Sequence, residues 1–314
     1  MQPTITPFPG FSVANDATAL REAMKGLGTD EDIIIDILTS RCNSQRQQIA
    51  KFFKDELGRD LIDDLKSELG GHFEDVIVAL VLPPDEYLCK QLHKAMEGMG
   101  TNEDTLIEII CSKTNSEMQQ LVDTYERMYE RPLTEHLCSE TGGNLRRLLT
   151  LISTGTRDDS KATNRNEARE KAEALYADGE GRFGTHESTF GSVLAHENFK
   201  QLQLIFEEYK DVSGNTIEQA LNHELSGDYL EALLAIVEYI QSPPAYFAAR
   251  LYKAMHGLGT DDTSLIRIIV SRSEIDLGDI KDEFERLYNK TLSSYIDQGE
   301  TTGDYKKALL AIIK

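Results

Sequence analysis

Four glycine-rich loops carry the residues of this chain that are best suited to binding a metal ion. They read MKGLGTDED at 24–32, MEGMGTNED at 96–104 and MHGLGTDDT at 255–263, with a weaker copy, GEGRFGTHES, at 179–188. Glycine permits sharp turns that expose backbone carbonyl oxygens, and these hard oxygen ligands suit Ca²⁺. A second interpretation is that each loop only ends one helix and begins the next.

A glutamate follows every loop at nearly the same distance. It lies forty residues after the second glycine in three copies and forty-one residues after it in the last copy. The pairs are Gly28 with Glu68, Gly100 with Glu140, Gly184 with Glu224, and Gly259 with Glu300. Three carbonyls and one bidentate carboxylate would supply about five of the six to eight oxygens that Ca²⁺ takes, which leaves positions for water or a lipid phosphate. This regularity favours calcium sites over simple turns.

The charge of the chain limits what it can bind directly. Its 314 residues include 54 acidic and 33 basic side chains, and the formal net charge is -21 at pH 7. Such a charge repels nucleic acid and anionic lipid. Calcium held between a glutamate and a lipid phosphate would remove the repulsion, so reversible binding to an anionic membrane is expected and nucleic-acid binding is not.

The residue between the two glycines of each loop is apolar. These four residues are Leu27, Met99, Phe183 and Leu258. Apolar side chains at loop tips can enter the headgroup boundary of a membrane, or each can pack beneath its own loop. The sequence leaves both interpretations open.

Helices must position the loops and the glutamates. In the first copy, apolar residues recur at helical spacing in five segments: DATALREAM, DIIIDILTSR, QQIAKFFKDEL, LIDDLKSEL and FEDVIVALVL. We find no alternation of period two, so the predicted class is all-α. If the helices run up and down with one short crossing helix, the first and last turns lie at one end, and the glutamate faces the loop. Thr29 is expected to be the N-cap of the second helix.

The loops divide the chain into four copies of one unit of about seventy residues. We expect a tail at 1–14, repeats at 15–86, 87–158, 170–243 and 244–314, and a linker at 159–169. The polar stretch 153–168 is interpreted as a linker between two halves of the protein.

Other classes of function find little support in the sequence. The start of the chain has no secretory signal, the apolar runs are too short for a bilayer span, and the four cysteines stand singly. The seven histidines do not recur at corresponding places, and no nucleophile with its base can be assembled from spacing. We therefore expect a cytoplasmic protein that is not an enzyme. The alternative is a calcium-independent helical-repeat scaffold that binds proteins.

The motif Met-x-Gly-x-Gly-Thr with a glutamate at a fixed interval resembles the annexin family, over about residues 15 to 314. The resemblance implies four homologous five-helix repeats packed into a curved disc. It also implies calcium-dependent, peripheral binding to anionic phospholipid on the cytosolic face of membranes. Self-association on the membrane is left open, and no partner is assigned to the tail.

The resemblance also implies which residues hold Ca²⁺. The first site would use the carbonyls of Met24, Gly26 and Gly28 with Glu68; the second, Met96, Gly98 and Gly100 with Glu140; the third, a longer variant loop, Gly179, Arg182 and Gly184 with Glu224; and the fourth, Met255, Gly257 and Gly259 with Glu300. Lys25 would contact lipid phosphate, but Glu97 and His256 stand at its place in the second and fourth copies. The extra residue before Glu300 also departs from the pattern.

Overall fold

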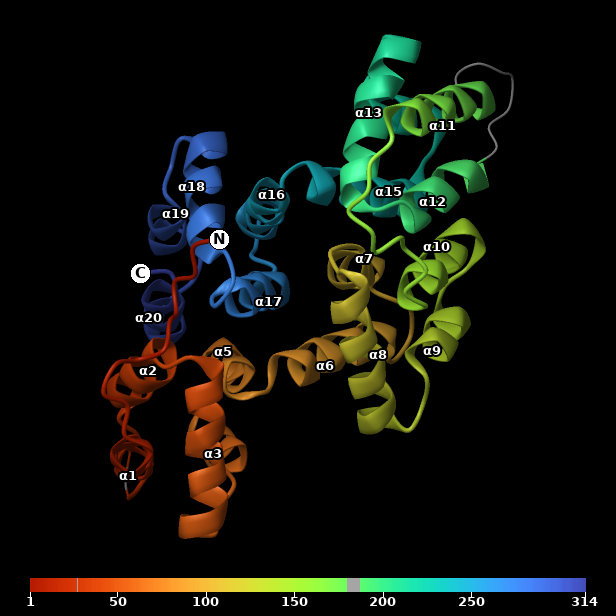
Figure 1. The fold of residues 1–314 in the computed structure, drawn as a ribbon. Helices are drawn as coiled ribbons and strands as arrows, with labels where there is room; N and C mark the ends of the chain where they lie inside the picture. The colour runs from red at the N-terminus through yellow and green to blue at the C-terminus, as the bar shows by residue number, and fades with distance from the viewer. Residues whose placement is uncertain (27, 180–186) are drawn as a thin grey trace. The chain divides into compact units, whose positions relative to one another are not determined.

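The computed structural model describes residues 1–26, 28–179 and 187–314, and these form two compact units. The first unit comprises Met1–Tyr87 and Phe247–Lys314, and the second comprises Leu88–Tyr246. Twenty α-helices and no strands occur in the described residues (Figure 1). The all-α prediction is confirmed. No helix in these ranges is both long and apolar enough to cross a membrane.

The first unit contains the first and the fourth repeat. Its helices are α1 (Val13–Ala23), α2 (Glu31–Ser40), α3 (Asn43–Leu57), α4 (Leu61–Glu68), α5 (Gly71–Val81), α17 (Asp262–Arg272), α18 (Leu277–Tyr288), α19 (Leu292–Gln298) and α20 (Gly303–Ile312), together with most of α16 (Pro243–Met255). The two repeats pack through their second and fifth helices, because α2 contacts α20 and α5 contacts α17 and α20.

The second unit contains the second and the third repeat. Its helices are α7 (Glu103–Cys111), α8 (Asn115–Tyr129), α9 (Leu133–Glu140), α10 (Gly143–Ser153), α11 (Arg165–Asp178), α12 (Glu187–His196), α13 (Phe199–Ser213), α14 (Ile217–Glu224) and α15 (Gly227–Gln241), together with most of α6 (Pro84–Met96). Here too the second and fifth helices meet, since α7 and α12 both contact α10 and α15. The polar segment between α10 and α11 lies inside this unit, so it does not separate the two units as the sequence suggested.

The segment before α1 is fixed to the fourth repeat. The N–H groups of Thr4 and Ile5 donate to the carbonyl oxygen of Ser273, at 2.8 and 3.0 Å. The N–H of Gly278 donates to the carbonyl oxygen of Gln2 at 2.7 Å. Ile5 is 4% exposed. The tail therefore has a docking place within its own unit.

The same segment is fastened to the first repeat as well. Phe8 exchanges two hydrogen bonds with the side chain of Gln45, at 2.9 and 3.1 Å. In the second unit, Asn164 and Gln201 form the same pair of bonds, at 2.8 and 2.9 Å. The two residues of each pair are 37 positions apart in the sequence. The tail is therefore bonded to the third helix of repeat one in the same way as the segment before α11 is bonded to the third helix of repeat three.

Gly278 makes room for the tail. The three equivalent positions of the other repeats carry Gln47, Gln119 and Gln203. The amides of Gln47 and Gln203 donate to the carbonyl oxygens of Val81 and Ile240 at the ends of the fifth helices. A Cβ atom on Gly278 would lie 2.7 Å from the Gln2 oxygen, so a side chain at this position would displace the tail.

Replacement of Gly278 by alanine should change stability in opposite directions with and without the tail. In the full chain we expect Gly278→Ala to lower the free energy of unfolding by about 1 to 3 kcal/mol, because the new methyl group overpacks against Gln2. In a chain that begins at Ser12, alanine should stabilise α18 by about 0.5 to 1 kcal/mol over glycine. Urea denaturation of the four proteins measures both effects, and a change of the same sign in both backgrounds would contradict this account.

Candidate metal sites

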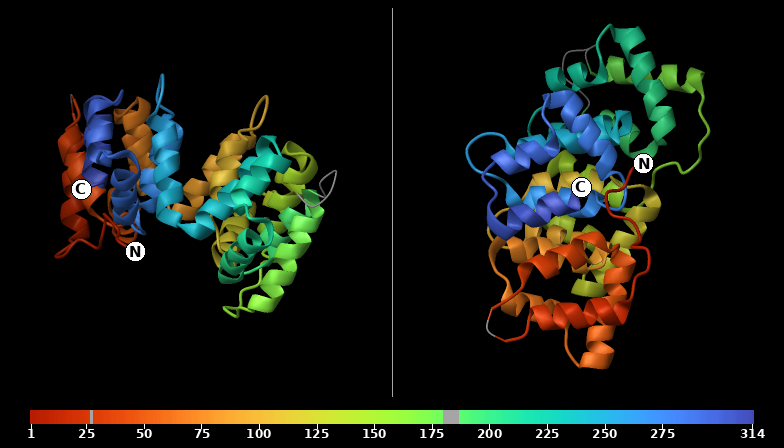
Figure 2. Two further views of the ribbon diagram at one scale, coloured as in Figure 1. Left: turned by 90° about the horizontal axis from the view of Figure 1, so that it is seen from above. Right: turned by 90° about the vertical axis from the view of Figure 1, so that its left-hand side faces the viewer.

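The glycines of three loops share one backbone conformation. Both glycines of each loop have positive φ, from 87° to 112°, a region that other residues occupy only with strain: Gly26, Gly28, Gly98, Gly100, Gly257 and Gly259. Each loop also closes with one backbone hydrogen bond from the residue after the threonine: Asp30 to Ala23 at 2.9 Å, Asn102 to Ala95 at 2.8 Å, and Asp261 to Ala254 at 2.8 Å. The loop after α16 projects beyond the neighbouring helix ends in Figure 2.

The second helices of these repeats begin at Glu31, Glu103 and Asp262. The N-caps are Asp30, Asn102 and Asp261, whose side chains accept the N–H groups of Ile33, Thr105 and Ser264. The prediction that Thr29 is the cap is therefore wrong by one residue. A carboxylate or amide two bonds from the backbone reaches the N–H groups of the first turn, which leaves the threonine hydroxyl available for another contact.

The structure brings the glutamates of the first and fourth repeats to their loops. Glu68 is the last residue of α4, and the hydroxyl of Thr29 donates to its Oε2 at 2.9 Å. The Oε1 of Glu300 accepts the N–H of Gly259 at 3.3 Å. The extra residue of the fourth repeat is thus absorbed between α19 and α20 without separating the carboxylate from its loop.

The second repeat joins its loop to the glutamate through the main chain. The hydroxyl of Thr101 donates to the carbonyl oxygen of Glu140 at 3.0 Å. The Ser139 hydroxyl lies 3.2 Å from the Glu140 carboxylate, but its one proton is donated to the carbonyl oxygen of His136 at 2.8 Å. Loop and glutamate are adjacent, but the loop threonine bonds the main chain of Glu140 and not its carboxylate.

Part of the third site lies outside the described residues. Arg182, Phe183 and Gly184 belong to that part, as does Leu27 in the first loop. Gly179 is the C-cap of α11. Glu224 is the last residue of α14, and its carboxylate lies 2.8 Å from Nδ1 of His223.

The loop tips are exposed where they are described. Met99 and Leu258 have exposed fractions of 106% and 104%. The interpretation that these side chains pack beneath their loops is therefore wrong for both. Met24 and Met96, by contrast, are only 3% exposed, so their side chains anchor the starts of the first and second loops.

The position after the methionine differs in each loop. Lys25 lies 3.3 Å from Glu22 and is otherwise exposed, so its ammonium group is available to a phosphate. Glu97 pairs with His93 at 3.4 Å, and Nδ1 of His256 lies 3.2 Å from the hydroxyl of Tyr295. Only the first of these three loops places a lysine at this position.

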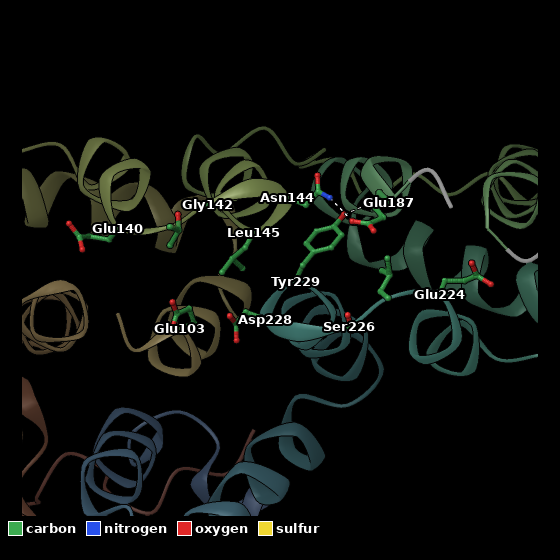
Figure 3. A pocket seen from close by; sticks show the side chains of 12 residues that line it. Glu103, Glu140, Gly142, Asn144, Leu145, Glu187, Glu224, Ser226, Asp228 and Tyr229 are labelled. Carbon is green, nitrogen blue, oxygen red and sulfur yellow. Dashed lines mark hydrogen bonds between the residues drawn. The ribbon is translucent and has the colours of Figure 1, made fainter. Parts of the chain in front are cut away.

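Glu140 and Glu224 line one acidic cavity of about 430 Å³ in the second unit. Figure 3 shows Asn144, Glu187 and Tyr229 grouped between them. Asn144 donates to the Glu187 carboxylate at 2.6 Å, and the hydroxyl of Tyr229 donates to the Glu187 carbonyl oxygen at 2.6 Å. Burial raises the pKa of Tyr229 to about 12, so its hydroxyl remains a donor at neutral pH. These bonds join the start of α12 to the fifth helices of both repeats.

The first unit has a matching arrangement at the corresponding positions. The hydroxyl of Tyr305 donates to the Asp262 carboxylate at 2.8 Å, and Nε2 of His72 lies 3.2 Å from the same carboxylate. Burial and the carboxylate of Asp262 raise the pKa of Tyr305 above its ordinary range. Sequence reasoning missed this role of the residues in the first turn of the fifth helix, although the offsets between repeats predict which residues correspond.

Carboxylates alone do not form a metal site in the part of the chain that the structure describes. Within residues 1–26, 28–179 and 187–314, no three His, Cys, Asp or Glu side chains are close enough together to hold an ion. The positive-φ loops with an adjacent glutamate instead offer a donor set of backbone oxygens and a single carboxylate, which fits Ca²⁺ better than Zn²⁺.

Comparison with known proteins places this architecture in a family. The family model for Annexin matches residues 15–80, 87–152, 170–236 and 246–312. Annexin B10 of Drosophila melanogaster is 58% identical over 312 residues, which cover 99% of this chain and 97% of that protein. Annexin A4 of Mus musculus is 48% identical over 309 residues, which cover 98% and 97%.

Solved structures agree with the sequence matches. Annexin III has a TM-score of 0.97 at 44% identity, covering 100% of this chain and 97% of that one. The calcium-bound structure of annexin (Sm)1 has a TM-score of 0.88 at 35% identity, covering 99% and 93%. Since four family matches span most of the chain and full-length relatives share about half of its residues, this protein belongs to the annexin family.

Proposed function

We propose that this annexin binds anionic phospholipid membranes reversibly, through Ca²⁺ held by loop carbonyls and one glutamate in each repeat. Calcium-dependent phospholipid binding is the general function of annexins. The observation that carries the proposal for this chain is the contact of Glu68 and Glu300 with positive-φ glycine loops. The role is one of binding, and we assign no reaction to the protein.

The proposed ligands follow from the loops. They are the carbonyl oxygens of Met24, Gly26 and Gly28 with Glu68; of Met96, Gly98 and Gly100 with Glu140; of Gly179, Arg182 and Gly184 with Glu224; and of Met255, Gly257 and Gly259 with Glu300. The third set rests on sequence spacing, and the other three are supported by the described loops.

Charge explains why binding would depend on calcium. At a net charge of -21, the protein is repelled by an anionic surface. Bound in the loops, Ca²⁺ would supply positive charge and open positions for lipid phosphate oxygens. Each site has one carboxylate, so its intrinsic affinity is weak and rises when an anionic headgroup completes the ligand set. Because lipid and Ca²⁺ bind together, the protein would leave the membrane when calcium falls. We propose that it binds as a peripheral protein on the cytosolic face of membranes, as the family resemblance implies.

Exposed loop tips support a second contribution to binding. Met99 and Leu258 extend from the same loops that would hold the ions, so calcium bridging would bring them to the headgroup boundary. Lys25 would add a direct contact with phosphate at the first loop. For Leu27 and Phe183 the same role is proposed from their positions in the sequence.

Loss of two glutamates should raise the calcium requirement of membrane binding. We expect Glu68→Gln with Glu140→Gln to need at least about tenfold more calcium to sediment with phosphatidylserine vesicles, because each site loses its charged ligand. The matched control is Glu56→Gln with Glu126→Gln, which removes the same charge from exposed positions on α3 and α8. An equal shift in the control would indicate a general charge effect. If the native chain stays in the supernatant at about 1 mM calcium, the protein-binding scaffold becomes the better explanation.

Polar loop tips should weaken attachment at saturating calcium. In Met99→Gln with Leu258→Gln, we expect each change to cost about 1 kcal/mol of membrane affinity, or roughly fivefold, because less apolar surface is buried. Vesicle titration measures this loss, and the thermal midpoint without vesicles should not change, since both side chains are exposed. Unchanged vesicle affinity would mean that the tips stay in water.

A further inference from the structure

We propose that Thr29 is a positioning residue that holds the carboxylate of Glu68 against the first glycine loop. The inference rests on the calcium site proposed above. The observation behind it is the hydrogen bond that the Thr29 hydroxyl donates to Oε2 of Glu68 at 2.9 Å. The two residues are thirty-nine positions apart in the sequence. The threonine is not one of the proposed ligands, so its role would be exerted through the glutamate.

Thr29 is itself well fixed. It is half-buried and stands between Gly28 and Asp30, whose N–H closes the loop on Ala23 and whose side chain caps α2. Its β-branched side chain also has few rotamers. The hydroxyl of Thr29 is therefore held in place by the ordered backbone beside it. Its hydrogen bond restricts the side chain of Glu68 in turn.

Glu68 needs such a contact because it is exposed at the end of α4. Among the residues that the structure describes, Thr29 is the hydrogen-bond donor to this carboxylate. Ordering a free glutamate side chain costs rotamer entropy. A carboxylate that is already directed at the loop binds a cation without that cost, so the hydroxyl should raise calcium affinity.

The hydrogen bond is compatible with bidentate binding. Each carboxylate oxygen has two lone pairs, and the hydroxyl donates one proton. Oε2 therefore keeps a lone pair while it accepts from Thr29, and Oε1 keeps both. Thr29 can remain bonded to the carboxylate in the free and the loaded site.

The second repeat provides an internal comparison. Thr101 occupies the equivalent position, but its hydroxyl donates to the main-chain oxygen of Glu140. The Ser139 hydroxyl lies 3.2 Å from the Glu140 carboxylate, but its one proton is donated to the carbonyl oxygen of His136 at 2.8 Å. Of these two threonines, the one in the second repeat bonds the main chain, and the one in the first repeat contacts the carboxylate. Calcium affinity should be more sensitive to threonine in the first repeat.

A purely structural role for the Thr29 hydroxyl is not supported. The cap of α2 is Asp30, and the loop is closed by backbone atoms. Removal of the hydroxyl alone should therefore leave the calcium-free fold unchanged. This separates the positioning role from a folding role.

The test uses the full chain with Glu140→Gln, Glu224→Gln and Glu300→Gln, so that the first site dominates the response. Into it are placed Thr29→Val, which keeps the shape and removes the hydroxyl, and Thr29→Ser, which keeps the hydroxyl. The measurement is the calcium dependence of the thermal-denaturation midpoint without membranes, which reports binding by linkage. We expect valine to need about tenfold more calcium and serine to stay within about twofold of threonine.

The matched control is Thr101→Val in a chain with Glu68→Gln, Glu224→Gln and Glu300→Gln. We expect a shift of at most about threefold there, because the hydroxyl does not touch the Glu140 carboxylate. Thr29→Val and Thr101→Val are also each compared in the otherwise native chain, by vesicle sedimentation against calcium. This second measurement decides the matter if a single remaining site gives too small a thermal response.

The outcomes separate this inference from the function on which it rests. If the native chain shows neither a calcium-dependent midpoint nor calcium-dependent sedimentation, the calcium site itself is wrong. If the native chain responds but Thr29→Val needs the same calcium as threonine, the positioning role is overturned while the site stands. The role is also overturned if serine fails to restore the response, if valine lowers the calcium-free midpoint, or if Thr101→Val shifts affinity as much as Thr29→Val.

Discussion

The backbone turn at the two glycines is the constraint on which the candidate metal sites depend. Both glycines of each described loop adopt a positive φ, and the loop then closes by a hydrogen bond onto an alanine of the preceding helix. A residue with a Cβ atom adopts this conformation only with strain, so the sequence has little freedom at these positions. The turn fixes where the loop carbonyls and the apolar tip can lie. It also sets the point at which a glutamate from the fourth helix must arrive.

Packing between repeats stabilises the helix ends that carry these turns. In each unit the second and fifth helices of two repeats are in contact. One second helix begins with an acidic residue that accepts a hydrogen bond from a tyrosine of the same repeat and also contacts a residue of the other repeat. In the second unit that other residue is Asn144, and in the first unit it is His72. These helix starts directly follow the glycine loops. The contacts between repeats therefore fix the helix ends from which the loops extend. The loops can therefore be short and exposed while their bases stay fixed.

The described repeats share backbone features that are formed by different residues and contacts. The third helices all end in a left-handed residue, and this residue is Gly58, Glu130, Gly214 or Asn289. The glutamates likewise meet their loops through a threonine hydroxyl, a main-chain oxygen or a glycine N–H. The backbone geometry is thus repeated more strictly than the side chains that maintain it.

The sequence by itself determined the number of repeats, the helical class and, for the three loops whose glycines the structure describes, the glycine turns and the glutamate that each turn meets. These features are local or periodic, so spacing and residue type are enough to predict them. Only the tertiary structure decided that the first repeat packs with the fourth, that the tail docks at Gly278, and that Thr29 contacts Glu68 rather than capping a helix. Each of these depends on which distant surfaces meet, and apolar periodicity shows that a helix has a buried face without identifying the residues that cover it.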